Sequence, residues 1–132
     1  MASDIGTGLQ VEMVAADRVV WSGEASMVIA RTSEGDLGVL RGHSPLLSLL
    51  VDAAVEIVTP EGIVHAAVDG GFISVAADRV SILSEHALLA EEIKVDEARA
   101  ELDAAEGLPT DDERELRIRR ASARLRAVEK AS

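Results

Sequence analysis

The 132-residue sequence contains no cysteine and no tyrosine, and it has one tryptophan and one phenylalanine. Without cysteine the chain has no disulfide, no thiolate nucleophile and no cysteine-based zinc site, a composition that suits a reducing compartment. Hydrophobic residues make up 48% of the chain but aromatic residues only 2%. The core must therefore be built from aliphatic side chains, which favours thin sandwich packing or small helical pairs over a deep ligand cavity.

Positive charge is also scarce, since 13 lysines and arginines face 24 aspartates and glutamates and leave a net charge of −11. An acidic chain repels the phosphate backbone, which argues against nucleic-acid binding. No apolar run approaches the roughly 20 residues of a membrane span. The N-terminus lacks the basic and then apolar order of a signal peptide. Residues 1–8 are expected to form a flexible tail, because their small and polar side chains bury little.

Residues 9–89 predict a β domain of about eight to ten short strands. Leu9, Val11 and Met13 alternate with polar residues, as in a half-buried strand. Further segments alternate or are rich in β-branched residues: 19–21, 26–32, 37–40, 54–59, 63–68, 72–76 and 80–83. The short connections leave no room for crossover helices, which excludes a parallel βαβ fold and favours an antiparallel β-sandwich or barrel.

Turn residues separate the predicted strands. Ser22-Gly23 is expected to stop the second strand, residues 33–36 to form a turn, and residues 41–45 to form a loop. Pro60-Glu61-Gly62 predicts one hairpin turn. Asp69-Gly70-Gly71 predicts another, because it supplies residues that accept a positive φ.

The composition changes near Leu89, since residues 90–113 carry ten acids and two bases, and residues 114–130 carry seven bases and two acids. Both parts have high helix propensity, which predicts helices at about 95–106 and 111–130. In each, apolar residues recur at spacings of three and four and give a narrow stripe that suits one partner helix. The stripes are Val95, Ala98, Leu102 and Ala105, and Ile118, Ala121, Leu125 and Val128.

Residues 90–132 therefore predict an antiparallel two-helix hairpin. Gly107 is expected to end the first helix, and Thr110 followed by acids is expected to cap the second. The stripes bury little apolar area, so the hairpin should be marginal by itself. It could dock on the sandwich, pack only on itself, or open towards another partner.

The segment Gly35–Leu47, with sequence GDLGVLRGHSPLL, resembles the signature Gly-acid-Leu/Ile-Gly-Ile-x-Pro-Gly-His-x-Pro-Leu-Leu of the epsilon subunit of bacterial F-type ATP synthase. Val68–Phe72 resembles that family's second signature, a Gly-Gly-aromatic hairpin. The order of elements also fits, and the resemblance covers Leu9 to Lys130. Arg41 stands where the family usually has proline, and the predicted hairpin is shorter than in well-known members.

The resemblance implies a non-catalytic central-stalk, or rotor, subunit of a proton-translocating complex. Such a subunit couples the catalytic head to the membrane ring for ATP synthesis and regulates ATP hydrolysis through its C-terminal helices. The implied partners are the gamma subunit, the c subunits of the ring and the catalytic beta subunits. The implied place is the cytoplasmic face of the bacterial cell membrane, reached through the complex without direct insertion. The alternative is a free-standing ATP-sensing regulatory β-sandwich protein without a rotary partner.

No catalytic residue, no metal and no required cofactor are expected, since His43, His65 and His86 are too scattered in the sequence for a metal motif. By the resemblance, Asp36, Arg41 and His43 are predicted contacts with gamma or the ring. Alternatively, Asp36 only stabilises a turn and His43 only caps a loop.

Residues 95–100 resemble the Ile/Leu-Asp-x-x-Arg-Ala motif with which some bacterial epsilon subunits bind ATP. This implies ATP as a regulatory ligand of the hairpin, since guanidinium groups hold phosphates well. The predicted ATP-binding residues are Val95, Asp96, Arg99, Ala100, Arg120 and Arg124. Alternatively, Asp96 and Arg99 form an i,i+3 ion pair, and the arginines of the second helix are solvated or pair with the acidic helix.

Arg117, Arg120 and Arg124 form a basic stripe on the second predicted helix. In the family this helix can extend along gamma towards the catalytic subunits, which carry an acidic helix-turn. The resemblance implies that the stripe binds there and blocks rotation in the hydrolysis direction, with an effect attenuated by the short hairpin. ATP, by holding the two helices together, would favour the non-inhibitory state.

Overall fold

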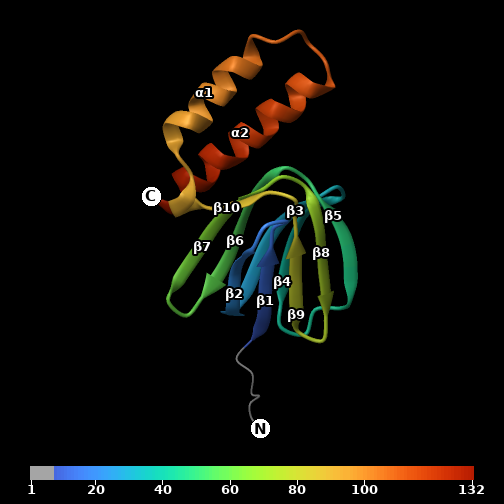
Figure 1. The fold of residues 1–132 in the computed structure, drawn as a ribbon. Coiled ribbons are helices and arrows are strands. Elements are labelled where there is room, and N and C mark those ends of the chain that lie inside the picture. Colours follow the sequence, from blue (N-terminus) through green and yellow to red (C-terminus); the bar gives the residue numbers. More distant parts are fainter. Residues whose placement is uncertain (1–7) are drawn as a thin grey trace.

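The fold is known from a computed structural model that describes residues 8–132. The expected flexible tail, residues 1–8, lies outside the described residues except for Gly8. In the described part of the chain, ten strands are followed by a short 3₁₀ helix and two α-helices (Figure 1). The strands are β1 (Leu9–Val14), β2 (Val19–Ala25), β3 (Met27–Thr32), β4 (Gly35–Leu40), β5 (Leu46–Leu50), β6 (Ala53–Thr59), β7 (Gly62–Val68), β8 (Gly71–Ala76), β9 (Arg79–Leu83) and β10 (Ala87–Leu89). The helices are η1 (Ala90–Glu92), α1 (Val95–Glu106) and α2 (Asp112–Ala131).

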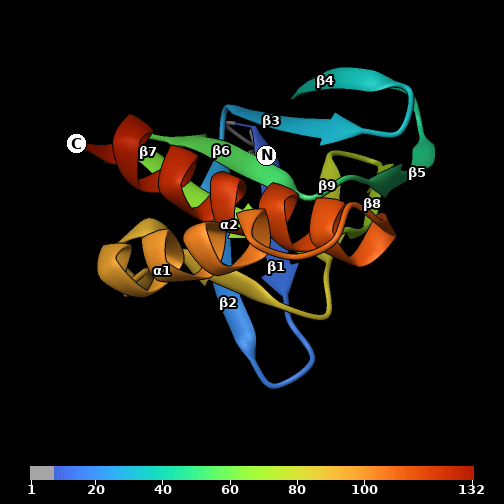
Figure 2. The same ribbon diagram turned by 90° about the horizontal axis from the view of Figure 1, so that it is seen from above.

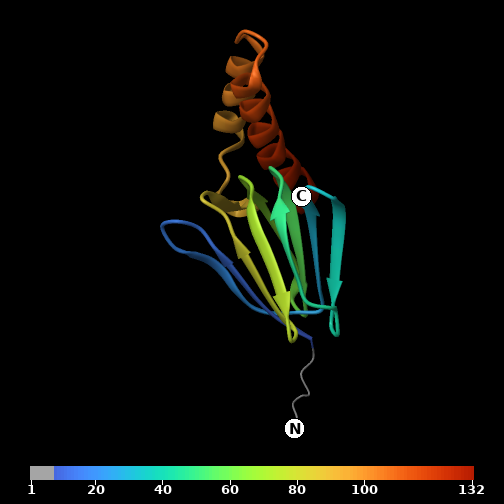
Figure 3. The ribbon, with the colours of Figure 1, turned by 90° about the vertical axis from the view of Figure 1, so that its right-hand side faces the viewer.

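The strands form a β-sandwich, which confirms the predicted fold class. They pair in the order β10-β7-β6-β3-β5-β8-β9-β1-β2, with β4 paired to β3 at the side. Figure 3 shows the layers packed face to face beneath the hairpin. One pair departs from the antiparallel rule, because β1 and β9 run parallel with Gln10 opposite Arg79. These two strands are far apart in the sequence, so this pairing needs no βαβ crossover.

The core is aliphatic, as the composition requires. Inward residues of each strand are buried, and the largest fully buried side chains are leucine, methionine, isoleucine and valine. In β1 the alternation of buried and exposed residues follows the sequence pattern, with Leu9 and Met13 fully buried. The single tryptophan, Trp21, only borders the core.

Three expectations about the strands are wrong. β2 does not stop at Ser22-Gly23 but continues to Ala25. Gly23 pairs with Val11, and an added Cβ there would come within 2.9 Å of the ring of Trp21. This glycine therefore makes room for the indole and does not break the strand. β5 and β10 are absent from the predicted strands, because β5 consists of four leucines and a serine without β-branching, and β10 has three residues.

Asp69-Gly70-Gly71 does not form a hairpin turn. β7 pairs with β6 and β10, whereas β8 pairs with β5 and β9, so this connection carries the chain from one part of the sheet order to another. The expected positive φ is confirmed at Gly70 (+65°) and Gly71 (+107°). A Cβ at Gly71 would collide with the carbonyl oxygen of Leu83. Glycine is thus needed for close passage between strands and not for a two-residue turn.

The helices form an antiparallel hairpin, and α1 has the predicted bounds. Gly107 ends α1 with an ordinary helical φ of −86°. The predicted cap of α2 is wrong by one residue, because Asp111 and not Thr110 is the N-cap. The Asp111 carboxylate accepts a hydrogen bond of 2.9 Å from the backbone N–H of Arg114. A carboxylate binds this free N–H more strongly than a hydroxyl does. Its negative charge is also attracted to the positive end of the helix dipole.

The hairpin docks on one end of the sandwich through α2, while α1 packs chiefly on α2 (Figures 1 and 2). Ala123 and Ala127 of α2 are buried against Ala67 of β7 and against Ile93. Another alanine of α2, Ala121, is buried about 200° around the helix from Ala123. α2 therefore has two buried faces instead of the single stripe expected, and most of the buried side chains on them are as small as alanine.

Candidate functional site

The loops at the hairpin end of the sandwich carry two acidic residues that face α2. Asp52 lies between β5 and β6, and Asp69 lies between β7 and β8. On α2, Arg120 and Arg124 are one turn apart and share a helix face, and Arg119 lies beside them. We name these five residues the helix–sandwich ion cluster.

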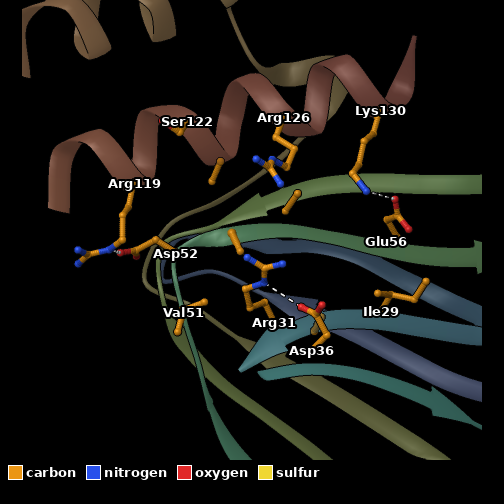
Figure 4. A pocket seen from close by; sticks show the side chains of 14 residues that line it. Ile29, Arg31, Asp36, Val51, Asp52, Glu56, Arg119, Ser122, Arg126 and Lys130 are labelled. Atoms are coloured by element: carbon orange, nitrogen blue, oxygen red, sulfur yellow. Dashed lines mark hydrogen bonds and ion pairs between the residues drawn. The ribbon is translucent and has the colours of Figure 1, made fainter. Parts of the chain in front are cut away.

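Every member of this cluster has an oppositely charged neighbour. Arg119 Nε and Arg120 Nε donate to the two carboxylate oxygens of Asp52, each at 3.3 Å, and Figure 4 shows the Arg119 contact. Arg124 Nη2 donates to Asp69 Oδ2 at 3.0 Å, and Arg120 Nε lies 3.9 Å from the same oxygen. The carboxylates of Asp52 and Asp69 are only 8% and 5% exposed. The arginines therefore shield both acids from water.

Burial makes the charge of Asp69 costly. Desolvation raises the pKa of its carboxyl above the usual value, although Arg124 and then Arg120 act in the opposite direction. The nearby Asp52 also raises this pKa, and His86, whose Nδ1 lies 3.7 Å away, lowers it. The Asp69 contact is thus geometrically well formed but is not a strong source of stability.

A cavity of about 350 Å³ opens between the two helices and the sandwich end, beside the cluster. Arg117, Arg120 and Arg124 line it together with Asp69 and the α1 residue Glu101. Within or beside this space, Arg124 Nη1 lies 3.5 Å from Glu101, and Arg117 Nη2 lies 3.0 Å from Glu113. Each arginine of the predicted inhibitory stripe thus has an acidic partner in the docked hairpin.

The predicted ATP site is not assembled in this conformation. Neither Asp96 nor Arg99 lines the cavity that Arg120 and Arg124 line, and both are exposed. Arg99 is two residues from Glu101, which places it about 200° around the helix from the side that faces Arg124. Val95 is half-buried and Ala100 is exposed. The Asp96–Arg99 ion pair of the alternative interpretation is also absent from residues 8–132, where Lys94 and Glu97 pair at 3.6 Å.

The signature stretch from Gly35 to Leu47 spans two strands and the loop between them. It forms β4, a loop and β5, so that it runs along the sandwich and back. Asp36 lies near the hairpin end and accepts a hydrogen bond of 2.8 Å from Arg31, which lowers the pKa of the Asp36 carboxyl. Figure 4 shows this pair beneath α2.

Arg41 and His43 lie at the opposite end of the sandwich from the hairpin. The backbone N–H of Gly42 donates to Asp78 in the β8–β9 turn at 2.7 Å, and Arg41 Nε lies 4.0 Å from the other oxygen of Asp78. His43 Nδ1 lies 2.7 Å from the carbonyl oxygen of Ser44. The structure therefore separates the predicted contact residues, with Asp36 at one end and Arg41 and His43 at the other.

The outer faces of β5, β8 and β9 carry an apolar surface. Leu49, Phe72 and Leu83 lie directly opposite one another across the three strands and are 52%, 46% and 48% exposed. In the next row Leu47 is 72% exposed. The uncharged strip, as we name it, consists of Leu47, Leu49, Phe72, Ser74, Ser81 and Leu83. α2 packs on β6 and β7 and leaves this face open.

No group of three or more His, Asp or Glu side chains in residues 8–132 is arranged to hold a metal ion. In the same part of the chain, no helix has the length and apolar character needed to cross a membrane.

Comparison with known proteins identifies the family. Residues 8–90 match the family described as "ATP synthase, Delta/Epsilon chain, beta-sandwich domain". The ATP synthase epsilon chain of Streptomyces griseus is 54% identical over 121 residues, which cover 91% of this chain and 94% of that protein. The chain belongs to the ATP synthase epsilon chain family.

Other similarities agree with the epsilon family. The epsilon chain of Nocardia farcinica is 45% identical over 134 residues, covering 100% of this chain and 98% of that protein. The fold resembles a chain in the structure of the Euglena gracilis mitochondrial ATP synthase, with a TM-score of 0.71, 23% identity, and coverage of 94% and 81%. As an epsilon-family member the chain is a non-catalytic subunit of an ATP synthase, and the free-standing ATP sensor is not favoured.

Sequence reasoning for this epsilon-family chain misses Asp52, Asp69 and Arg119. In the sequence Asp69 is only a turn residue within the second signature, and Asp52 belongs to no motif. A signal does exist for the uncharged strip, since the only phenylalanine of the chain follows two glycines, and Ser74, the next residue on the same face of the strand, is neutral.

Proposed function

We propose that this epsilon-family chain is the rotor subunit that attaches the gamma subunit to the c ring of a proton-translocating ATP synthase. The uncharged strip is the observation that carries this proposal. Three leucines and the only phenylalanine of the chain gather on this exposed face, which Glu12 and Arg79 border. Exposed apolar patches with an aromatic anchor are typical of protein interfaces. The gamma subunit is the proposed occupant, because a rotor subunit must be held firmly on the shaft.

Attachment is tested by co-expression with the gamma subunit. We expect the two chains to co-purify as a stoichiometric complex through size-exclusion chromatography. A chain that elutes alone, with gamma folded and present, would contradict the rotor function and would favour the free-standing alternative.

The ring contact is proposed for the end of the sandwich that carries Arg41 and His43. The hairpin occupies the opposite end, and the hairpin must be free to reach the catalytic head. Arg41 is 60% exposed at its side chain, so it remains available to polar loops of the c subunits. Asp36 is proposed as a gamma-side contact, since its carboxylate is 70% exposed although it is paired with Arg31. With these proposed contacts, the proposed location of the chain is the cytoplasmic face of the bacterial cell membrane.

The hairpin is proposed to inhibit ATP hydrolysis by placing Arg117, Arg120 and Arg124 against acidic segments of the catalytic beta subunits. The small alanine contacts between α2 and the sandwich support a hairpin that can leave its docked position, because they bury little apolar area. Deleting residues 91–132 is expected to raise ATP hydrolysis by the assembled complex. An unchanged rate would contradict the inhibitory function while leaving the attachment to gamma intact.

ATP is proposed as an optional regulatory ligand of the hairpin and not as a required cofactor. Binding by Val95, Asp96, Arg99, Ala100, Arg120 and Arg124 requires the helices to rotate or shift from the docked arrangement. Titration calorimetry with ATP, repeated with Arg99→Ala and Arg124→Ala, tests this. We expect both variants to weaken binding. Equal weak heats for all three proteins would contradict a specific site.

A further inference from the structure

The arginine surface that the proposed function assigns to a partner is already occupied inside this chain. Arg120 and Arg124 belong to the predicted inhibitory stripe, and their guanidinium groups contact Asp52 and Asp69 of the sandwich. Their side chains are 34% and 19% exposed. A partner carboxylate therefore cannot use the sandwich-facing N–H groups of these arginines while the sandwich carboxylates hold them.

The face of α2 that docks on the sandwich offers little apolar area to a binding partner. Its apolar contacts with the sandwich are made chiefly by Ala123 and Ala127. Charged contacts, by contrast, recur along the helix, from Arg119 with Asp52 to Lys130 with Glu56 at 3.4 Å. The chemistry that this face recognises is thus a row of carboxylates.

We propose that Asp52 and Asp69 are intramolecular competitors of an acidic helical segment on a partner subunit. By holding Arg120 and Arg124, the two sandwich carboxylates mask the surface with which α2 would bind that segment. This inference rests on the proposed inhibitory function, and it names the residues that keep the inhibitory surface out of use in the docked hairpin.

The cost of burying Asp69 suits this role. Because desolvation raises the pKa of the carboxyl, the ionised Asp69 holds its arginines without gaining a strong net stabilisation. A competitor of this kind can be displaced by another carboxylate row. A fully stabilised buried ion pair would instead lock the hairpin permanently.

Binding of a glutamate-rich helical peptide to the full chain tests the competition. Fluorescence anisotropy is measured at about 50 mM salt, where screening is modest. The double variant Asp52→Asn/Asp69→Asn is expected to bind the peptide at least about fivefold more tightly than the unmodified chain. Adding Arg120→Gln and Arg124→Gln to this variant is expected to abolish the gain.

A control variant accounts for the change in net charge. Glu24→Gln/Glu61→Gln removes two exposed carboxylates at the end of the sandwich opposite the hairpin, and it should leave peptide affinity nearly unchanged. If the double asparagine variant binds the peptide no better than this control, the competition is wrong. If circular dichroism shows that the double variant does not fold, the single variants Asp52→Asn and Asp69→Asn replace it. Each is expected to show part of the gain in peptide affinity.

Hydrolysis by the assembled complex separates this inference from the proposed function. Removing the carboxylates and removing the arginines of the same ion pairs should have opposite effects on the rate of ATP hydrolysis. Asp52→Asn/Asp69→Asn is expected to lower ATP hydrolysis, and Arg120→Gln/Arg124→Gln is expected to raise it. Tighter peptide binding without any change in hydrolysis would support the competition and contradict the inhibitory function. Unchanged peptide binding would contradict the competition whatever the hydrolysis rate.

Discussion

The connection between β7 and β8, at the hairpin end of the sandwich, serves two purposes. Gly71 lets β8 pass close to Leu83, and the neighbouring Asp69 projects to the arginines of α2. From the sequence, the signature around these residues predicts only a turn. Its φ values could be predicted because only glycine accepts them readily, but its contacts could not, since Asp69 and Arg124 are 55 positions apart.

Gly71→Ala is expected to destabilise the sandwich strongly, by about 2 kcal/mol or more, because the new methyl group meets the Leu83 carbonyl at a positive φ. Gly62→Ala is the matched control, since Gly62 has a φ of +137° but no atom beyond its own chain neighbours within 4 Å of the position that its new methyl group would take. Urea unfolding of both variants measures the difference. Equal losses of free energy of unfolding would show that the close passage is unimportant.

Asp69→Asn is expected to be as stable as the unmodified chain at pH 7, or more stable. Since the folded pKa of Asp69 is raised, its contribution to the free energy of unfolding is fullest below the usual carboxyl pKa of about 3.9 and is lost as pH rises through the folded pKa. Arg124 keeps Glu101 and Arg120 keeps Asp52 as partners. Thermal unfolding across this pH window, compared with Glu61→Gln, measures the effect. A clear loss of stability at pH 7 would contradict it.

Secondary-structure elements differ in how far the sequence determines them. The alternation of Leu9, Val11 and Met13 is enough to predict β1, and helix propensity with Gly107 is enough to bound α1. β5 could not be recognised, because leucine is not among the residues that favour strands and only the pairing with β8 places this segment in the sheet. The second buried face of α2 could not be recognised either. Alanine occurs on buried and exposed helix faces alike, so the sequence does not indicate that these alanines contact the sheet.

The cap of α2 gives a test at this scale. Asp111→Ala is expected to cost about 1 kcal/mol, because the backbone N–H of Arg114 loses its acceptor. Thr110→Ala should cost far less, although the sequence pattern favours Thr110. Loss of helical signal at 222 nm during urea unfolding measures both. The reverse order of effects would show that the hydroxyl is the true cap.

The three proposed partner-binding surfaces lie on different sides of the molecule. The uncharged strip lies on β5, β8 and β9, Arg41 and His43 lie at the end away from the hairpin, and the arginines of α2 lie at the other end. A rotor subunit needs such separation, because the shaft, the ring and the catalytic head approach it from different directions. Family resemblance predicted the partners, but only the register of the strands revealed which neutral residues form the strip.

The account is tested most directly by the affinity of single variants for the gamma subunit. Leu49→Asp in the strip is compared with Ile63→Asp on β7, since both side chains are 52% exposed. We expect Leu49→Asp to weaken binding at least about tenfold, as a charge buried without a partner costs well over 1.4 kcal/mol, and Ile63→Asp to leave binding unchanged. Equal affinities for the two variants would contradict the proposal that the uncharged strip holds this subunit on the shaft.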